Sequence, residues 1–340
     1  MNIIKDEDWN RCQYTSKPQS KMKKGHYESY FLRANHPSKA EAFWIRYTIF
    51  SPKNAMKDAV GELWAIYFNG ETEEVVAVKE EIPMSNCQFS PNGINVRVGE
   101  ATLAPGQLTG AINNTNNNLS WELGYKQDGN ANDTLLFLPK KLYQMKLPKA
   151  KAIVGQPNAL FNGTLTVNNR TINLENWRGS ENHNWGSQHT DEYAWGQVAG
   201  FDDNADAFLE CITARIKIGP FWSPELTIAV FRMNGKEYRF NTIKTALKAQ
   251  ASYGFFDWSF KTTNGLETLE AHIQAPRKHF IGLTYNNPPG GTHTCLNTKI
   301  ASCSISLTEK NGKAHKLTTK NRAAFELLTD LSNHGVPVVA

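Results

Sequence analysis

The sequence has few cysteines and none of the spacings that cysteine-based sites require. Five cysteines, an odd number, are spread over 340 residues, and no C-x-x-C pair occurs. This usage indicates neither a disulfide framework nor a zinc site, and it fits a reducing compartment. His183 and His189 lie six residues apart, but no second histidine-rich segment supplies further ligands, so we expect no metal.

Long apolar runs and dense charge are also absent. No window approaches the ~18 consecutive apolar residues of a membrane span, and acidic residues stand where a secretory signal would place its apolar core. We therefore expect a cytoplasmic protein without stable membrane insertion. The net charge is +5, but the charges of both signs are interspersed and the one dense basic run, 21–24, is short. A nucleic-acid partner is not expected.

Two further patterns are missing or rare. The Gly-x-Ser-x-Gly motif of nucleophilic serine enzymes does not occur, so the sequence offers no support for a catalytic triad. Only 320–332 has helical spacing, with an apolar stripe from Ala323 to Leu331 and Gly335 just beyond its end. We predict one C-terminal helix there.

What the sequence does contain is β-pattern on both sides of a proline-rich connection. Because 340 residues exceed the roughly 250–300 at which single cores stop growing, we expect two domains. Between Leu138 and Pro157 the alternation is lost while prolines and lysines accumulate, which places the boundary near Lys149. The predicted domains are residues 1–148 and 149–340.

Short runs of alternating apolar and polar residues, separated by turn formers, predict an all-β, mainly antiparallel fold. The Asn-Gly pairs at 69–70 and 234–235, each between two predicted strands, predict hairpins. The predicted strands are 43–50, 62–68, 75–79, 94–98, 107–112, 118–125, 163–167, 193–201, 207–218, 225–233, 236–240 and 300–307.

One stretch, 176–201, differs from these strands because it combines three tryptophans with histidines and asparagines in what reads as a turn-rich segment. Large aromatics interleaved with polar groups suit a pocket that holds an apolar ligand and directs a few hydrogen bonds at it. Alternatively, the tryptophans are core residues whose indoles need polar partners. The candidate ligand-binding residues are Trp177, Asn182, Asn184, Trp185, Trp195 and Gln197.

If 193–198 is a strand, Tyr193, Trp195 and Gln197 share one face and smaller residues share the other. An aromatic cavity also favours general acid chemistry, because burial keeps a carboxyl neutral and able to protonate an alkene. The candidate catalytic residues are His183 and Tyr193 together with the carboxyl groups of Glu181, Asp191, Glu192 and Glu210. The segment 283–297 reads as a long loop, either a lid or a simple connection.

The order Trp177-x-Gly179, then 182–186 (Asn-His-Asn-Trp-Gly), then 193–197 (Tyr-Ala-Trp-Gly-Gln) resembles the two-domain lipocalin-like family that includes carotenoid 1,2-hydratase and tocopherol cyclase relatives. The resemblance implies two consecutive lipocalin-like β-barrels, an isoprenoid- or lipid-like ligand, and cofactor-free acid-catalysed hydration or cyclisation of an alkene. His183, Trp185 and Tyr193 would correspond to pocket residues of the hydratases. The aspartate that follows this tyrosine in the hydratases has no clear match here.

Two other classes of protein remain open at this point. Tryptophan platforms flanked by amides and carboxylates also hold sugars, so a carbohydrate-binding or carbohydrate-active β-protein is the first alternative. A structural or partner-binding module, in which the aromatics are all core, is the second.

Overall fold

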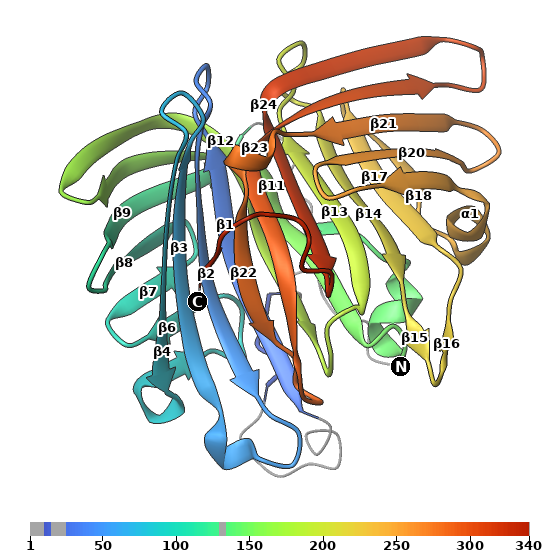
Figure 1. The fold of residues 1–340 in the computed structure, drawn as a ribbon. Coiled ribbons are helices and arrows are strands. Elements are labelled where there is room, and N and C mark those ends of the chain that lie inside the picture. The colour runs from blue at the N-terminus through green and yellow to red at the C-terminus, as the bar shows by residue number, and fades with distance from the viewer. Residues whose placement is uncertain (1–9, 15–24, 129–133, 340) are drawn as a thin grey trace.

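The computed structural model describes residues 10–14, 25–128 and 134–339, and nearly all regular structure in these ranges is β-strand. Two large sheets, A and B, stand side by side (Figure 1). The single α-helix among these residues, α1 (Ile243–Lys248), is short, and no helix in them has the length and apolar character to span a membrane. The basic run 21–24 lies outside the described residues.

Sheet A is antiparallel and barrel-like. Its first four strands form a meander, and its last strand, β12, returns to pair with β1. β3 and β4 pack across the enclosed core against β8. The strands are β1 (His26–Asn35), β2 (Glu41–Ser51), β3 (Val60–Asn69), β4 (Glu74–Pro83), β5 (Cys87–Phe89), β6 (Val96–Val98), β7 (Ala101–Ala104), β8 (Gln107–Asn113), β9 (Asn118–Gln127), β10 (Leu135–Leu136), β11 (Ala150–Val167) and β12 (Arg170–Gly186).

Sheet B repeats this plan, with a meander of four strands whose first member pairs with the last long strand, β24. A small hairpin, β15–β16, connects the second and third strands of the meander. The strands are β13 (Glu192–Ala199), β14 (Phe208–Arg215), β15 (Lys217–Ile218), β16 (Phe221–Trp222), β17 (Leu226–Met233), β18 (Lys236–Phe240), β19 (Gln250–Tyr253), β20 (Asp257–Thr263), β21 (Thr268–Gln274), β22 (Ile281–Asn286), β23 (Thr292–Thr308), β24 (Ala314–Thr329) and β25 (Val338–Val339).

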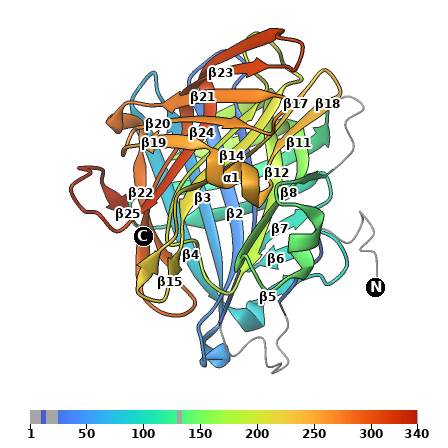
Figure 2. The ribbon, with the colours of Figure 1, turned by 90° about the vertical axis from the view of Figure 1, so that its right-hand side faces the viewer.

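The apolar core has three main parts. Each sheet encloses one cluster of buried side chains, and a third cluster joins β1, β2 and β3 of sheet A to β13 and β22–β24 of sheet B. We call this third region the inter-sheet layer. Figure 2 shows the strands of the two sheets crossing in front of one another. The candidate site lies on β13 of this layer and on two strands next to it, β14, which pairs with β13, and β12 of sheet A, which contacts β13.

The all-β prediction is confirmed, as are the strands placed in both halves and the hairpins at Asn-Gly pairs 69–70 and 234–235, which are β3–β4 and β17–β18. The boundary near Lys149 stays a prediction. Sheet A itself continues beyond that residue through β11 and β12, and the chain passes to sheet B between Gly186 and Glu192.

Three predictions of local structure are wrong. The C-terminal helix at 320–332 is the end of strand β24, in which Ala323, Phe325 and Leu327 face the core of sheet B while Ala324 and Leu328 face the inter-sheet layer. A strand buried on both faces reads as a continuous apolar run, which periodicity cannot separate from a helix. The loop at 283–297 is mostly the β22–β23 pair. The turn-rich stretch 176–201 is two strands, β12 and β13.

Candidate functional site

The two faces of β12 divide the candidate residues into two groups. Because side chains alternate along a strand, Glu181, His183 and Trp185 project toward the interior enclosed by sheet A, at one end of that barrel-like sheet. Asn182 and Asn184 project into the inter-sheet layer. Sheet A therefore separates residues that stand next to one another in the sequence.

Inside sheet A, the carboxylate of Glu28 on β1 organises the first group. His183 and His26 each place Nε2 2.9 Å from one of its oxygens, and the backbone N–H groups of Gln13 and Tyr14 donate to the same carboxylate. Burial acts to raise the pKa of Glu28, but the hydrogen bonds and charges of His183 and His26 outweigh it and lower the pKa to about 2. Glu28 is thus a buried anion and cannot serve as an acid.

Glu181 lies deeper in the same group. Tyr125 Oη and Asn10 Nδ2 each donate to its carboxylate at 2.6 Å. Burial raises the pKa of Glu181, although these two hydrogen bonds oppose the shift. The neighbouring His183 ring stacks on Tyr30 at 4.2 Å. Residues 10–14 therefore close this end of the barrel with direct hydrogen bonds to both buried carboxyl groups.

Trp177, also on this face of β12, belongs to neither group. It is 1 % exposed, lies in the core cluster of sheet A and packs against Phe43 and His36. For this tryptophan the core interpretation is correct. Trp185 is only half-buried and contacts His183 and Tyr143.

The second group meets in the inter-sheet layer around the carboxyl of Glu210 on β14. Trp195 Nε1 donates to one carboxyl oxygen and Gln197 Nε2 to the other, both at 2.7 Å. Tyr193, Trp195 and Gln197 share one face of β13, as predicted, while Ala194 and Val198 face the core of sheet B.

Gln197 links the two sheets through hydrogen bonds. Its Oε1 accepts from Arg33 Nε and from Ser180 Oγ, both at 2.7 Å, and its Nε2 also donates to Asn182 Oδ1 at 2.7 Å. Gln197, its three partners from sheet A and Glu210 are each at most 3 % exposed. A side chain of sheet B is therefore fixed by three residues of sheet A.

Burial dominates the ionisation of this network. It raises the pKa of Glu210 to about 7, against the opposing hydrogen bonds from Trp195 and Gln197 and the charge of Arg33. Burial likewise lowers the pKa of Arg33 to about 9. A carboxyl with such a pKa is partly protonated at neutral pH, which is the state that a general acid requires.

The surroundings of Glu210 are apolar and aromatic. Trp195 belongs to the inter-sheet cluster with Phe31 and Trp44, and Glu210 pairs across strands with Val230 of a neighbouring apolar cluster. Ile212, two residues along β14, packs against both clusters. An apolar ligand beside Glu210 would therefore contact hydrocarbon and ring surfaces.

One edge of the inter-sheet layer is less tightly covered than the rest. Tyr193 and Ile212 are half-buried there, and Ile228 lies opposite Ile212 on the next strand. Asn184 on β12 is also half-buried, and its Oδ1 is a buried acceptor without a hydrogen-bond partner among the described residues. Such an acceptor offers a polar ligand group one fixed hydrogen bond.

Two predicted acids lie outside both groups. Asp191 Oδ2 accepts a hydrogen bond from the backbone N–H of Lys217 at 2.9 Å. Glu192 pairs with Arg215 at 3.5 Å. Both are half-buried in or beside the connection between the sheets, where they stabilise the local turn and do not face Glu210.

The sequence reading missed several charged residues that the layer contains. Arg33 is described above, and Lys299 Nζ pairs with Glu326 at 2.7 Å while lying 5.5 Å from the ring centre of Trp44 and 5.6 Å from that of Trp195. Both stand in strands of mixed polarity, β1 and β23, so nothing in the sequence sets them apart from surface charges. No group of His, Cys, Asp and Glu in the described ranges forms a metal-binding cluster.

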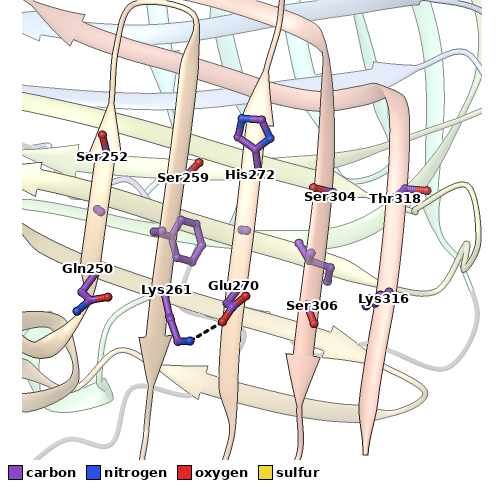
Figure 3. A pocket seen from close by; sticks show the side chains of 14 residues that line it. Gln250, Ser252, Ser259, Lys261, Glu270, His272, Ser304, Ser306, Lys316 and Thr318 are labelled. Atoms are coloured by element: carbon purple, nitrogen blue, oxygen red, sulfur yellow. Dashed lines mark ion pairs between the residues drawn. The ribbon is translucent and has the colours of Figure 1, made fainter.

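A surface groove of about 670 Å³ lies elsewhere, across β19, β20, β21, β23 and β24 of sheet B (Figure 3). Serine, threonine and charged side chains cover it, and Lys261 and Glu270 form an ion pair at 2.6 Å. None of the predicted site residues lines it. Phe260, its one aromatic residue, is 4 % exposed, so the groove lacks the aromatic platform expected for sugars.

Comparison with known proteins connects this geometry to relatives. The family model described as tocopherol cyclase-like matches residues 141–327, more than half of the chain. Two uncharacterized proteins from strains of Mycobacterium tuberculosis are each 24 % identical over 291 residues, which cover 83 % of this chain and 82 % of each relative.

Solved structures with a similar fold have much lower sequence identity. An AttH-like protein from Nitrosomonas europaea has a TM-score of 0.55 at 10 % identity, with 89 % of this chain and 92 % of that chain covered. Kievitone hydratase from Nectria haematococca has a TM-score of 0.55 at 12 % identity, with 90 % and 89 % covered. CghA has a TM-score of 0.53 at 10 % identity, with 95 % and 97 % covered. These similarities establish the lipocalin-like fold.

Proposed function

This chain belongs to the tocopherol cyclase-like family, and from that premise we propose that it binds an isoprenoid- or lipid-like molecule in the inter-sheet layer. There it catalyses acid-dependent hydration or cyclisation of an alkene without a cofactor. One of its structural neighbours is named as a hydratase, which supports this class of reaction.

The observation that carries the proposal is the buried carboxyl of Glu210. Of the predicted acids, it combines a pKa raised to about 7 with an apolar, aromatic environment. Trp195 and Gln197 hold both of its oxygens in place. Water exclusion keeps part of the carboxyl population protonated at neutral pH, and the two donors are positioned to stabilise the carboxylate that forms when the proton leaves.

The proposed reaction begins with proton transfer from Glu210 to one alkene carbon. The π electron pair forms the new C–H bond, and the adjacent carbon becomes cationic. The oxygen of a water molecule, or of a hydroxyl in the same substrate, then donates an electron pair to that carbon. Its proton returns to the Glu210 carboxylate, so the acid is restored and atoms and charge balance.

The aromatic ring next to the acid is suited to the cationic intermediate. Trp195 lies against Glu210, with Nε1 2.7 Å from a carboxyl oxygen, and a ring quadrupole attracts positive charge within about 6 Å. The Lys299 ammonium near this ring is paired with Glu326 at 2.7 Å. Asn184, Tyr193 and Ile212 at the half-buried edge of the layer would orient the substrate. The other predicted group, with His183, Trp185 and Glu181, lies on the opposite face of β12.

The test is incorporation of deuterium by the purified protein in D2O with a panel of prenylated phenols and other isoprenoid alkenes. Mass spectrometry detects both product and the deuteron added at carbon. We expect Glu210→Gln to lower turnover about a hundredfold or more, as for loss of a general acid, and turnover by the natural protein to fall as pH rises through about 7.

Glu181→Gln is the matched control, because it is the same change at a buried carboxyl on the other face of β12. Full activity of Glu210→Gln would refute the assignment, and loss confined to Glu181→Gln would place the acid inside sheet A. A protein that retains no apolar compound and shows no tryptophan quenching with any isoprenoid would contradict the ligand class itself.

A further inference from the structure

Exposed apolar side chains gather on three segments of this molecule. The segments are the connection 139–148, the hairpin β15–β16 and the helix α1. They lie along the right-hand side of Figure 1, the side that Figure 2 turns to the viewer. Of the nine large apolar side chains exposed in the described ranges, six are on these segments: Met145 (55 %), Leu147 (63 %), Phe221 (74 %), Trp222 (37 %), Ile243 (67 %) and Leu247 (51 %).

One hydrogen bond and the neighbouring strand β17 connect the three segments. Asn241, two residues before α1, donates from Nδ2 to the backbone oxygen of Phe137 at 2.9 Å, which joins the helix to the connection. The helix also packs on β17, and the hairpin leads into β17 from β14. The backbone N–H of Ser223 closes the hairpin by donating to the oxygen of Ile216 at 2.8 Å.

Basic residues outnumber acidic ones on these segments. None of 139–148, 216–224 and 242–256 contains Asp or Glu, although Asp191 accepts a hydrogen bond from the backbone N–H of Lys217 at the start of the hairpin and Glu225 follows its end. At the hairpin, Trp222 lies between two cations, Arg215 at 4.9 Å and Lys217 at 4.8 Å from its ring centre, although Glu192 partly neutralises Arg215. The exposed lysines of this face are Lys140, Lys141, Lys146, Lys217, Lys244 and Lys248.

We propose that this apolar and basic face docks the protein on the surface of a bilayer that contains anionic lipids. Apolar side chains that project from short elements enter the acyl boundary, and tryptophan prefers the headgroup region. The lysines around them complement the negative surface potential of such a bilayer. Exposed apolar patches of this kind mark interaction surfaces on soluble folds.

Other occupants fit the face less well. In a symmetric dimer through this surface, the six lysines of one copy would oppose the six of the other. Nucleic acid would satisfy the charge but would leave the apolar tips at Phe221 and Ile243 exposed to water.

The position of the face suits the proposed reaction but docking does not depend on it. Strand β14 runs from Glu210 through Ile212 to Arg215, at the base of the hairpin. An isoprenoid alkene dissolves in the bilayer and not in water, so the docked protein would present the end of this strand to its substrate. Vesicle binding is measured without turnover, and the two proposals therefore succeed or fail separately.

The experiment is co-sedimentation of the full chain with phosphatidylcholine vesicles, with and without phosphatidylglycerol, at low and high salt. We expect binding only to the anionic vesicles, weakened by salt. The double variant Phe221→Ser, Ile243→Ser should weaken binding at least tenfold. The double variant Lys244→Glu, Lys248→Glu should weaken it by more than roughly fivefold per residue, because each substitution reverses a charge.

Matched controls use exposed apolar and basic residues elsewhere, Leu266→Ser with Leu331→Ser and Lys310→Glu with Lys313→Glu. They should bind like the natural protein. The proposal would be overturned if the natural protein did not bind anionic vesicles at low salt, or if the control variants lost as much binding as the test variants. It would also be overturned if the natural protein bound heparin but not vesicles, and the Phe221→Ser, Ile243→Ser variant bound heparin equally tightly.

Discussion

Replacing Glu210 by glutamine should change how the stability of this protein depends on pH. Below about pH 4.5, the ordinary value for glutamate, the carboxyl is protonated in both folded and unfolded chains. Between 4.5 and 7 the unfolded chain ionises while folded Glu210 keeps its proton, because burial raises its pKa to about 7. Folding stability due to this group is therefore present at low pH and lost as pH rises through 7.

The size of this effect follows from the pKa difference. A shift from 4.5 to about 7 is about 2.5 units, and each unit corresponds to about 1.36 kcal/mol, so the contribution is about 3 kcal/mol. Glu210→Gln removes it at every pH. The free-energy difference, natural protein minus variant, should thus fall by about 3 kcal/mol between pH 4.5 and 8, whatever constant cost the amide adds.

Urea denaturation of both proteins at several pH values measures this difference. Other titrating groups, such as Glu28, are common to both proteins and cancel. Infrared spectroscopy gives a second reading, since the carbonyl band of a protonated carboxyl should disappear near pH 7 in the natural protein alone. A difference that stays constant within 1 kcal/mol over this range would refute the reasoning about Glu210.

Two other substitutions probe the inter-sheet layer. Gln197→Leu leaves Arg33 Nε and Asn182 Oδ1 without their hydrogen-bond partner. We expect the free energy of unfolding, measured by urea denaturation, to fall by about 3–5 kcal/mol. A fall below about 1 kcal/mol would contradict the role of Gln197 in joining the sheets. Burial, with the charges of Arg46 and His293, lowers the pKa of His189 from 6.5 to about 3, so this group costs stability as pH falls below 6.5. His189→Phe keeps the stacking on Tyr27. When the pH is lowered from 7 to 5, the free energy of unfolding of this variant should fall by about 2 kcal/mol less than that of the natural protein. Equal falls would refute the lowered pKa of His189.

The sequence predicted the β architecture well because most strands have one polar face or end at clear turns. Strands buried on both faces were harder. β24 was read as a helix, because it packs on the core of sheet B with one face and on the inter-sheet layer with the other. Its apolar residues therefore occur on both faces, and such a run fits the spacing of a helix as well as that of a strand. β12 was read as a turn-rich segment, since its polar residues serve two different interiors.

The candidate site was predicted in part. Trp195, Gln197, Glu210 and Asn182 do meet, although Glu210 was only one of several carboxyl groups considered. Arg33 could not be foreseen, because its contact with Gln197 spans 164 residues and depends on how two sheets pack. Pairings of this kind follow from tertiary structure, and a single sequence carries almost no trace of them.

The alternation of β12 has a consequence for how this protein could change over time. Its odd positions from 180 to 185 face the interior of sheet A and its even positions face the inter-sheet layer, so a substitution at Asn182 or Asn184 alters the layer while His183 and Trp185 stay untouched. Selection could therefore adjust each environment independently, even though both are encoded in six consecutive residues. Insertion of one residue would have the opposite effect, because it would exchange the side chains that face the two environments.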